Sequence, residues 1–221
     1  MAAGFLAAPA RSGRNGFVFA KDTGGDEFSQ LSWFDLDTRE VTLLTDGQRS
    51  QNRGALFSRD GTQLAYSSTS RNGSDTDVWV RDMATGEARI VVDAGGMWFA
   101  QDFSPDGKHL LVTRYVSINE SYPGEVDLAT GELTLFPVDG GKAAFGAFRY
   151  GPDGESVYFV SDEPVDGRDS EFMTLRFHDP RSGELRELSG DIPWDVEGFA
   201  LAPDGRHLAY VTNEDGIDRL R

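Results

Sequence analysis

The sequence predicts an all-β protein, a β-propeller of four-stranded antiparallel blades whose ring is incomplete, with about four blades and part of a fifth. Two turn phrases that recur in register, and the strand-rich segments between them, carry this prediction. The first phrase appears at 57–61, 103–107, 151–154 and 202–205, each time ending in Asp-Gly, and its Asp residues lie 46, 47 and 51 residues apart. A repeat of this period is typical of blades stacked in an array.

The turn phrases are explained by their backbone requirements. In Phe-Ser-Pro-Asp-Gly (103–107) the proline presets φ for the second position of a type I turn, and the glycine closes the turn. The second phrase reads Asp-Met-Ala-Thr-Gly-Glu at 82–87 and has related copies at 127–132 and 179–184. Its glycine supplies a positive φ cheaply, whereas an earlier copy at 35–40 has Arg39 there and is expected to hold that conformation at some cost.

The segments between the turns predict the strands. The third unit contains short apolar runs at 98–104, 109–115, 124–128 and 132–136, separated by turn residues. No stretch has the length and periodicity of a substantial helix. The expected blades cover the ranges 17–45, 54–92, 98–138, 145–188 and 196–221, with residues 1–16 as a tail or truncated stub.

The fifth predicted blade stops before its last strands. Because propellers close with complete blades, which removes exposed sheet edges, we expect the chain to be part of a longer protein or to be completed by another chain.

Composition excludes several classes of partner. The net charge of −16 argues against nucleic acid, which is bound largely by Lys and Arg neutralising phosphates. The chain has no cysteine and no apolar run near the ~20 residues that span a bilayer, so we expect no disulfide and no membrane partner. The N-terminal residues lack a convincing signal-peptide pattern, which leaves the cytoplasm and the periplasm open. No pattern indicates a cofactor or a bound metal.

Several phrases resemble the N-terminal propeller of bacterial prolyl oligopeptidase-family (S9) serine peptidases. The resemblance runs from about Phe17 to Arg221, and the Ser-Pro-Asp-Gly turns by themselves fit any TolB-like propeller. The phrases that narrow it to the peptidases are Ile-Asn-Glu-Ser-Tyr at 118–122 and Asp-Ile-Pro-Trp-Asp-Val-Glu at 191–197.

The resemblance implies a function for the parent protein. In that family the propeller caps an α/β-hydrolase domain with a Ser-Asp-His triad and filters substrates by size. This sequence has no Gly-x-Ser-x-Gly elbow and no His-Gly-Gly phrase, so the chain alone is expected to be no enzyme. The expected role is to gate and position oligopeptides for a hydrolase domain in a longer parent chain, a peptidase of the acylaminoacyl, dipeptidyl or prolyl oligopeptidase type.

Two loops hold the candidate substrate-binding residues, since binding residues collect on loops of rigid scaffolds. They are Asn119, Glu120, Tyr122, Trp194, Asp195 and Glu197. The hypothesis is that Glu120 and Trp194 face the central chamber or the hydrolase interface. The alternative is that they are blade-packing and turn residues. Some relatives bind a peptide amino terminus with adjacent glutamates, but this sequence has no Glu-Glu pair.

Other candidate features have simpler explanations. The acidic loops at 72–77 and 213–218 lack the spacing of a calcium loop, and turn chemistry accounts for them. His109 and His207 share one position in the repeat, where a polar, solvent-facing role is expected. A function of another class is a stand-alone TolB-like propeller that binds a protein partner, with self-association through open blade edges.

Overall fold

The computed structural model describes residues 3–7, 15–138, 141–165, 167–168, 170–202 and 204–221, and these contain nineteen strands and no helix. The strands form five antiparallel sheets in sequence order. The first sheet consists of β1 (Ala3–Ala7), β2 (Gly16–Lys21), β3 (Gln30–Asp35) and β4 (Val41–Leu43). The second consists of β5 (Asn52–Phe57), β6 (Gln63–Ser68), β7 (Asp77–Asp82) and β8 (Ala88–Val92). The third consists of β9 (Met97–Phe103), β10 (His109–Ser117), β11 (Glu120–Asp127) and β12 (Leu133–Leu135). The fourth consists of β13 (Phe145–Tyr150), β14 (Val157–Ser161), β15 (Thr174–Asp179) and β16 (Glu184–Glu187). The fifth consists of β17 (Val196–Leu201), β18 (Leu208–Glu214) and β19 (Ile217–Leu220).

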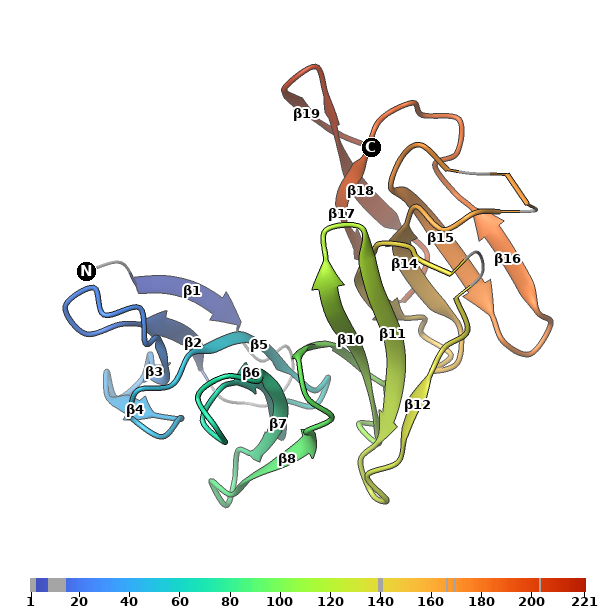
Figure 1. Ribbon diagram of the computed structural model, residues 1–221. Helices are drawn as coiled ribbons and strands as arrows, with labels where there is room; N and C mark the ends of the chain where they lie inside the picture. The colour runs from blue at the N-terminus through green and yellow to red at the C-terminus, as the bar shows by residue number, and fades with distance from the viewer. Residues whose placement is uncertain (1–2, 8–14, 139–140, 166, 169, 203) are drawn as a thin grey trace.

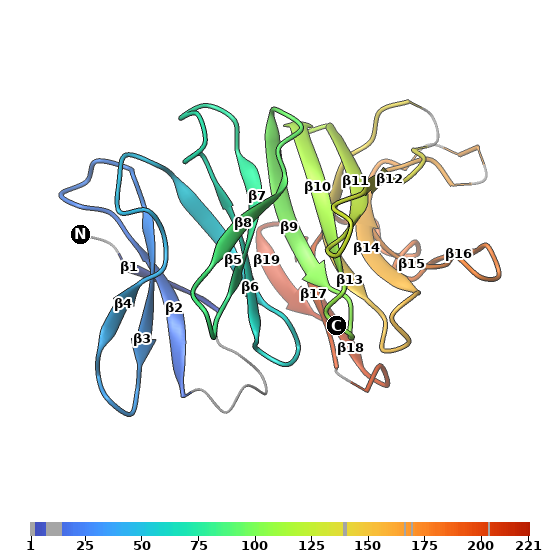
Figure 2. The ribbon, with the colours of Figure 1, turned by 90° about the horizontal axis from the view of Figure 1, so that it is seen from below.

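The sheets are the blades of a β-propeller, as predicted. Figure 1 shows them following one another in an arc from β1 to β19, and Figure 2 shows the first four side by side from below. The first strand of each sheet contacts the first strand of the next, so these strands lie nearest the common axis. Four blades have four strands and the fifth has three.

The first blade differs from the expectation at its N-terminal strand. Residues 3–7, assigned from sequence to a tail, form β1 and pair with β2, with Ala3 opposite Lys21 and Phe5 opposite Phe19. Small apolar residues can form a paired strand without an alternating pattern. No turn phrase precedes this segment, however, so the sequence does not mark it as part of the repeat.

The apolar core is divided among the interfaces between successive blades. Buried side chains of neighbouring sheets form four clusters. Trp33 is buried between the first and second blades and Trp98 between the second and third. The outermost strands β4 and β16 are exposed along their whole length. Each blade is therefore stabilised mainly by its neighbours.

The second turn phrase behaves as its chemistry predicts. The carboxylate of Asp127 accepts hydrogen bonds from the backbone N–H groups of Ala129 (2.8 Å) and Thr130 (2.9 Å), and Gly131 has φ +78°. In the earlier copy the Asp35 carboxylate makes the equivalent bonds, and Arg39 adopts φ 62°. The expectation that Arg39 occupies the left-handed region is confirmed.

Replacing Arg39 by glycine is expected to stabilise the protein. The left-handed conformation costs a non-glycine residue about 1–2 kcal/mol, which exceeds the extra chain entropy that glycine loses on folding. We expect the free energy of unfolding to rise by about 0.5–1 kcal/mol, measured by urea denaturation. An unchanged or lower value would show that the Arg39 side chain contributes more than its backbone costs.

The first turn phrase joins neighbouring blades. A Cβ atom on Gly154 would lie 3.3 Å from Cδ of Pro105, and one on Gly205 would lie 2.5 Å from Cγ of Pro152. The proline of each turn therefore packs on the glycine of the next. The second blade has Arg59 in place of this proline, and its guanidinium donates a 3.4 Å hydrogen bond to the carbonyl oxygen of Gly151 in the fourth blade.

Acid is expected to weaken these turns. The Asp106 carboxylate accepts hydrogen bonds from the Ser104 hydroxyl (2.7 Å) and the Lys108 N–H (3.1 Å), and these bonds lower its pKa to about 2. Because the folded pKa lies below the ordinary 3.8, the stabilisation is present above pH 3.8 and is lost as the pH falls towards 2. We expect the urea midpoint to fall more steeply across this range in the wild type than in Asp106→Asn; parallel profiles would contradict the assignment.

Candidate functional site

The first group of sequence-predicted residues lies at the hairpin between β10 and β11. Asn119 is exposed in the turn, and Glu120 begins β11. The Glu120 carboxylate accepts hydrogen bonds from the Lys142 ammonium (2.5 Å) and the Tyr122 hydroxyl (2.7 Å), which together lower the pKa of Glu120. The hydrogen bond between Tyr122 and Glu120 also raises the pKa of Tyr122. Glu120 is thus a paired carboxylate at one end of the third blade.

The second group lies at the entrance to β17. The Asp195 carboxylate accepts a 2.9 Å hydrogen bond from the backbone N–H of Met173, which ties this loop to the start of β15. Trp194 is half-buried, and Glu197 lies at a register shift in β17, where the pairing passes from Val196 to Gly198. Within the described residues, no hydrogen bond or ion pair joins this group to Glu120. That Glu120 and Trp194 face the central chamber or the hydrolase interface therefore stays a prediction.

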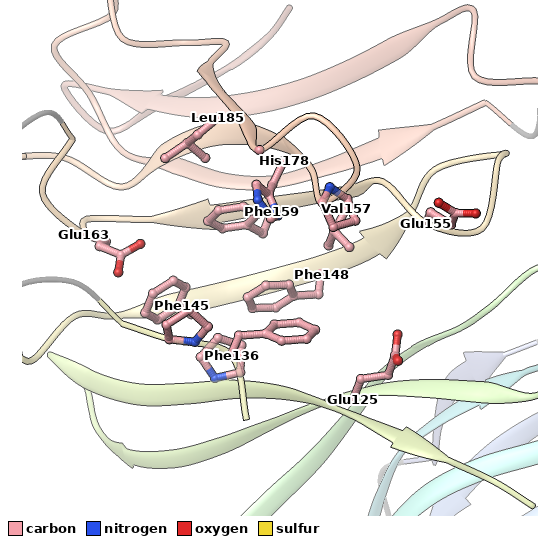
Figure 3. Close-up of a pocket in the computed structure, with 14 residues that line it drawn as sticks. Glu125, Phe136, Phe145, Phe148, Glu155, Val157, Phe159, Glu163, His178 and Leu185 are labelled. Atoms are coloured by element: carbon pink, nitrogen blue, oxygen red, sulfur yellow. The ribbon is translucent and has the colours of Figure 1, made fainter. Parts of the chain in front are cut away.

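An apolar cavity of about 490 Å³ lies elsewhere, between the third and fourth blades. Figure 3 shows its lining: Phe136 and Phe145 on one side, Phe159 and His178 on the other, and Phe148 between them. Pro123 and Glu125 of β11 form part of the wall. Since side chains alternate along a strand, Tyr122 lies on the opposite face of β11 from these two residues. The cavity and the predicted residues are therefore separate sites.

A β-bulge builds the aromatic wall. In β13 the pairing passes from Gly146 to Arg149 with one extra residue, and Ala147 has φ 49°. Simple alternation would turn Phe145 and Phe148 to opposite faces, whereas the bulge brings both to the cavity. Their ring centroids lie 6.1 Å apart, and the Phe148 and Phe159 rings stack at 5.3 Å.

Carboxylates lie at the ends of the cavity. Figure 3 places Glu163 at one end and Glu125 and Glu155 towards the other. Glu125 accepts a 2.5 Å hydrogen bond from the Tyr150 hydroxyl, and burial together with this bond raises the pKa of Tyr150. The lining offers carboxylates and one imidazole but, within the described residues, no hydroxyl, thiol or amine side chain. Its chemistry is suited to binding.

A buried cation lies beside this site on the fourth blade. Arg176 is 0% exposed, and its Nε donates a 3.0 Å hydrogen bond to the Thr174 hydroxyl. Neither Nη atom has a hydrogen-bond partner within the described part of the chain. Burial lowers the pKa of Arg176, while Glu187, Glu163 and Asp162 oppose that shift. The guanidinium is therefore held by the field of several carboxylates.

Another, more open cavity of about 360 Å³ lies next to the second predicted group. Asp191, Ile192 and Pro193 line it, together with Thr174 and Glu187. The Asp-Ile-Pro-Trp-Asp phrase thus borders a cavity, although Trp194 and Asp195 are not among its walls.

Comparison with known proteins identifies the fold. No protein-family model matches the sequence. TolB from Acinetobacter baumannii is similar over 96% of this chain at 22% identity, with a TM-score of 0.74, and the chain spans 50% of that protein. The fold is a TolB-like β-propeller. A putative TolB from Agrobacterium tumefaciens is similar over 98% of the chain at 16% identity and a TM-score of 0.70, covering 75% of that protein. A prolyl endopeptidase is similar over 98% of the chain at 15% identity and a TM-score of 0.56, with 41% of it covered.

Sequence reasoning missed the cavity of this TolB-like propeller. Its aromatic residues are spread over 136–159, so their density was the available signal. The structure also places the histidines: His178 lines the cavity, whereas His207 is exposed. No described group of three or more acidic or histidine side chains has the arrangement of a metal site. The described residues also include no helix able to cross a membrane.

Proposed function

We propose that this propeller is a non-catalytic recognition module that binds an extended polypeptide segment, with one side chain inserted into the cavity between the third and fourth blades. The observation that carries this proposal is the aromatic cavity of about 490 Å³, a volume typical of ligand sites. A cavity lined mainly by apolar side chains favours an apolar occupant, because burial of apolar surface supplies the binding free energy.

The parent protein in this proposal is a serine peptidase of the prolyl oligopeptidase type. The propeller would admit oligopeptides and position them for an α/β-hydrolase domain. The Ile-Asn-Glu-Ser-Tyr and Asp-Ile-Pro-Trp-Asp-Val-Glu phrases support this assignment, and the similarity to a prolyl endopeptidase is consistent with it in fold. The coding DNA beyond Arg221 tests it: a reading frame that reaches a Gly-x-Ser-x-Gly elbow supports the assignment, and an immediate stop codon contradicts it.

The recognition role is tested with the chain itself. Fluorescent octapeptides with a central leucine are titrated by anisotropy, and we expect saturable binding with a Kd on the order of micromolar. Phe136→Leu, on the cavity wall, is expected to weaken binding about tenfold. Phe57→Leu is the matched control, since Phe57 is also half-buried but packs between the first two blades. Equal affinity in both variants, or turnover of peptidyl substrates blocked by a serine-directed reagent, would refute the proposal.

A stand-alone interaction module is the second candidate function. The higher TM-score to TolB, 0.74 against 0.56 for the prolyl endopeptidase, favours it. In the fifth blade, β19 presents Ile217 and Leu220, 61% and 77% exposed. Such an edge could pair with a second copy of the chain. A concentration-dependent dimer in sedimentation experiments that Ile217→Lys abolishes would support this function, and a monomer at all concentrations would contradict self-association.

A further inference from the structure

We infer that the cavity between the third and fourth blades takes a group that is both apolar and positively charged, an alkylammonium carried either by a small molecule or by a lysine side chain. In its peptide form this inference rests on the proposed function, and it adds the charge of the inserted group. Three features of the cavity carry it: the ring faces, the carboxylates at the ends, and the balance of charge behind the walls.

The rings provide the first feature. Phe145, Phe148 and Phe159 form one cluster, with centroids 5.3–6.1 Å apart, and Phe136 adds a fourth ring to the lining. The negative face of an aromatic ring attracts a cation within about 6 Å of its centroid, and aromatic cages use this attraction to bind methylated ammonium groups. The methyl or methylene groups that carry the charge also gain from burial against the apolar walls.

The carboxylates provide the second feature. Figure 3 shows Glu163 at one end of the ring cluster, with its carboxylate directed towards the rings, and Glu125 at the other end. Glu163 is only 9% exposed. No Lys or Arg side chain is among the described residues of the lining. An anion would be repelled by these carboxylates, whereas a cation would be attracted by them.

The basic groups behind the walls do not cancel the negative charge of the carboxylates. Arg181 pairs with Asp153 at 3.2 Å and also with Glu155, and so it is already neutralised. Arg176 lies near Glu163, Glu187 and Asp162. Carboxylates therefore still outnumber guanidinium groups around the cavity, and the chain as a whole carries a net charge of −16. The cavity lies in a negative potential, which favours a cationic occupant.

The decisive experiment compares two ligands of the same shape. Choline and its uncharged analogue 3,3-dimethylbutan-1-ol are titrated into the wild-type chain and followed by NMR shifts of the aromatic resonances. We expect choline to bind at least about tenfold more tightly than the alcohol. In Glu163→Gln this preference should shrink to about threefold or less, whereas Glu184→Gln, on an exposed carboxylate of β16, should leave it unchanged. Equal binding of the two ligands, or no saturation by either up to about 50 mM, would overturn the inference.

A second pair of probes separates the two sources of the cation. Octapeptides with a central lysine or a central norleucine differ in the charge at the side-chain end. A tighter lysine peptide identifies a polypeptide as the source, and choline preference with no peptide binding identifies a small molecule, in which case the proposed function fails while the inference stands. If both peptides bind equally, both are weakened by Phe136→Leu, and choline shows no preference over the alcohol, the proposed function stands and this inference fails.

Discussion

Replacing Leu110 by alanine is expected to lower the free energy of unfolding by about 3 kcal/mol. Leu110 is 0% exposed in β10 and packs in the cluster between the second and third blades, so the change removes buried methyl groups and leaves a cavity. For a chain of this length, that loss corresponds to a fall in Tm of about 6–12 °C. We measure this by urea denaturation and compare the slope of unfolding free energy against urea concentration between variants. An unchanged slope shows that only stability has changed.

The same substitution at Leu220 is the control. Leu220 is 77% exposed in β19, and Leu220→Ala is expected to change stability by no more than about 0.5 kcal/mol. If the two variants lost equal stability, the blade interfaces would not be the main source of the folding free energy. If Leu110→Ala removed only one of two separate transitions, the blades would unfold independently instead of as one cooperative array.

The fold could be predicted because turn chemistry is local. The residues 103–107 and 127–132 specify turns through the φ of Pro and Gly and through an Asp that accepts backbone N–H groups, and these requirements hold whatever surrounds them. Even the departure at Arg39 was predictable, since the other copies have glycine there. The strand β1 was not, because Ala3–Ala7 has neither a turn phrase before it nor an alternating pattern.

The cavity could not be predicted because it depends on which face each side chain takes. Phe145 and Phe148 are three residues apart, and a regular strand would separate them. The extra residue at Ala147 brings both rings to the same face, but an alanine in the sequence does not indicate a positive φ. The loop candidates were proposed from position alone. The structure shows that Glu120 is bound by Lys142 and Tyr122, a pairing that spans 22 residues for Lys142 and has no local sequence signal.

The contact between successive turns leads to the second large effect, the destabilisation expected from Gly205→Ala. Gly205 has φ +68°, and a Cβ atom there would lie 2.5 Å from Cγ and 3.0 Å from Cδ of Pro152. Proline is rigid and belongs to a turn that is itself packed on the neighbouring blade, so the clash must be relieved by moving the fifth blade away from the fourth. We expect the free energy of unfolding to fall by about 2–4 kcal/mol, with backbone strain and overpacking both contributing.

Gly131→Ala separates these two contributions. Gly131 has φ +78° in the turn after β11, but apart from its chain neighbours no described residue has an atom within 4 Å of its added Cβ. This variant carries the backbone cost alone and is expected to lose only about 1 kcal/mol. The difference between the two variants, measured by urea denaturation, is then the contribution of the contact between turns. If Pro152→Ala in the Gly205→Ala background restores part of the loss, the proline ring is the obstacle, and the repeated Pro-Asp-Gly phrase is explained by the packing of each turn on the next. If the two glycine variants lose the same amount, the phrase is explained by backbone conformation alone.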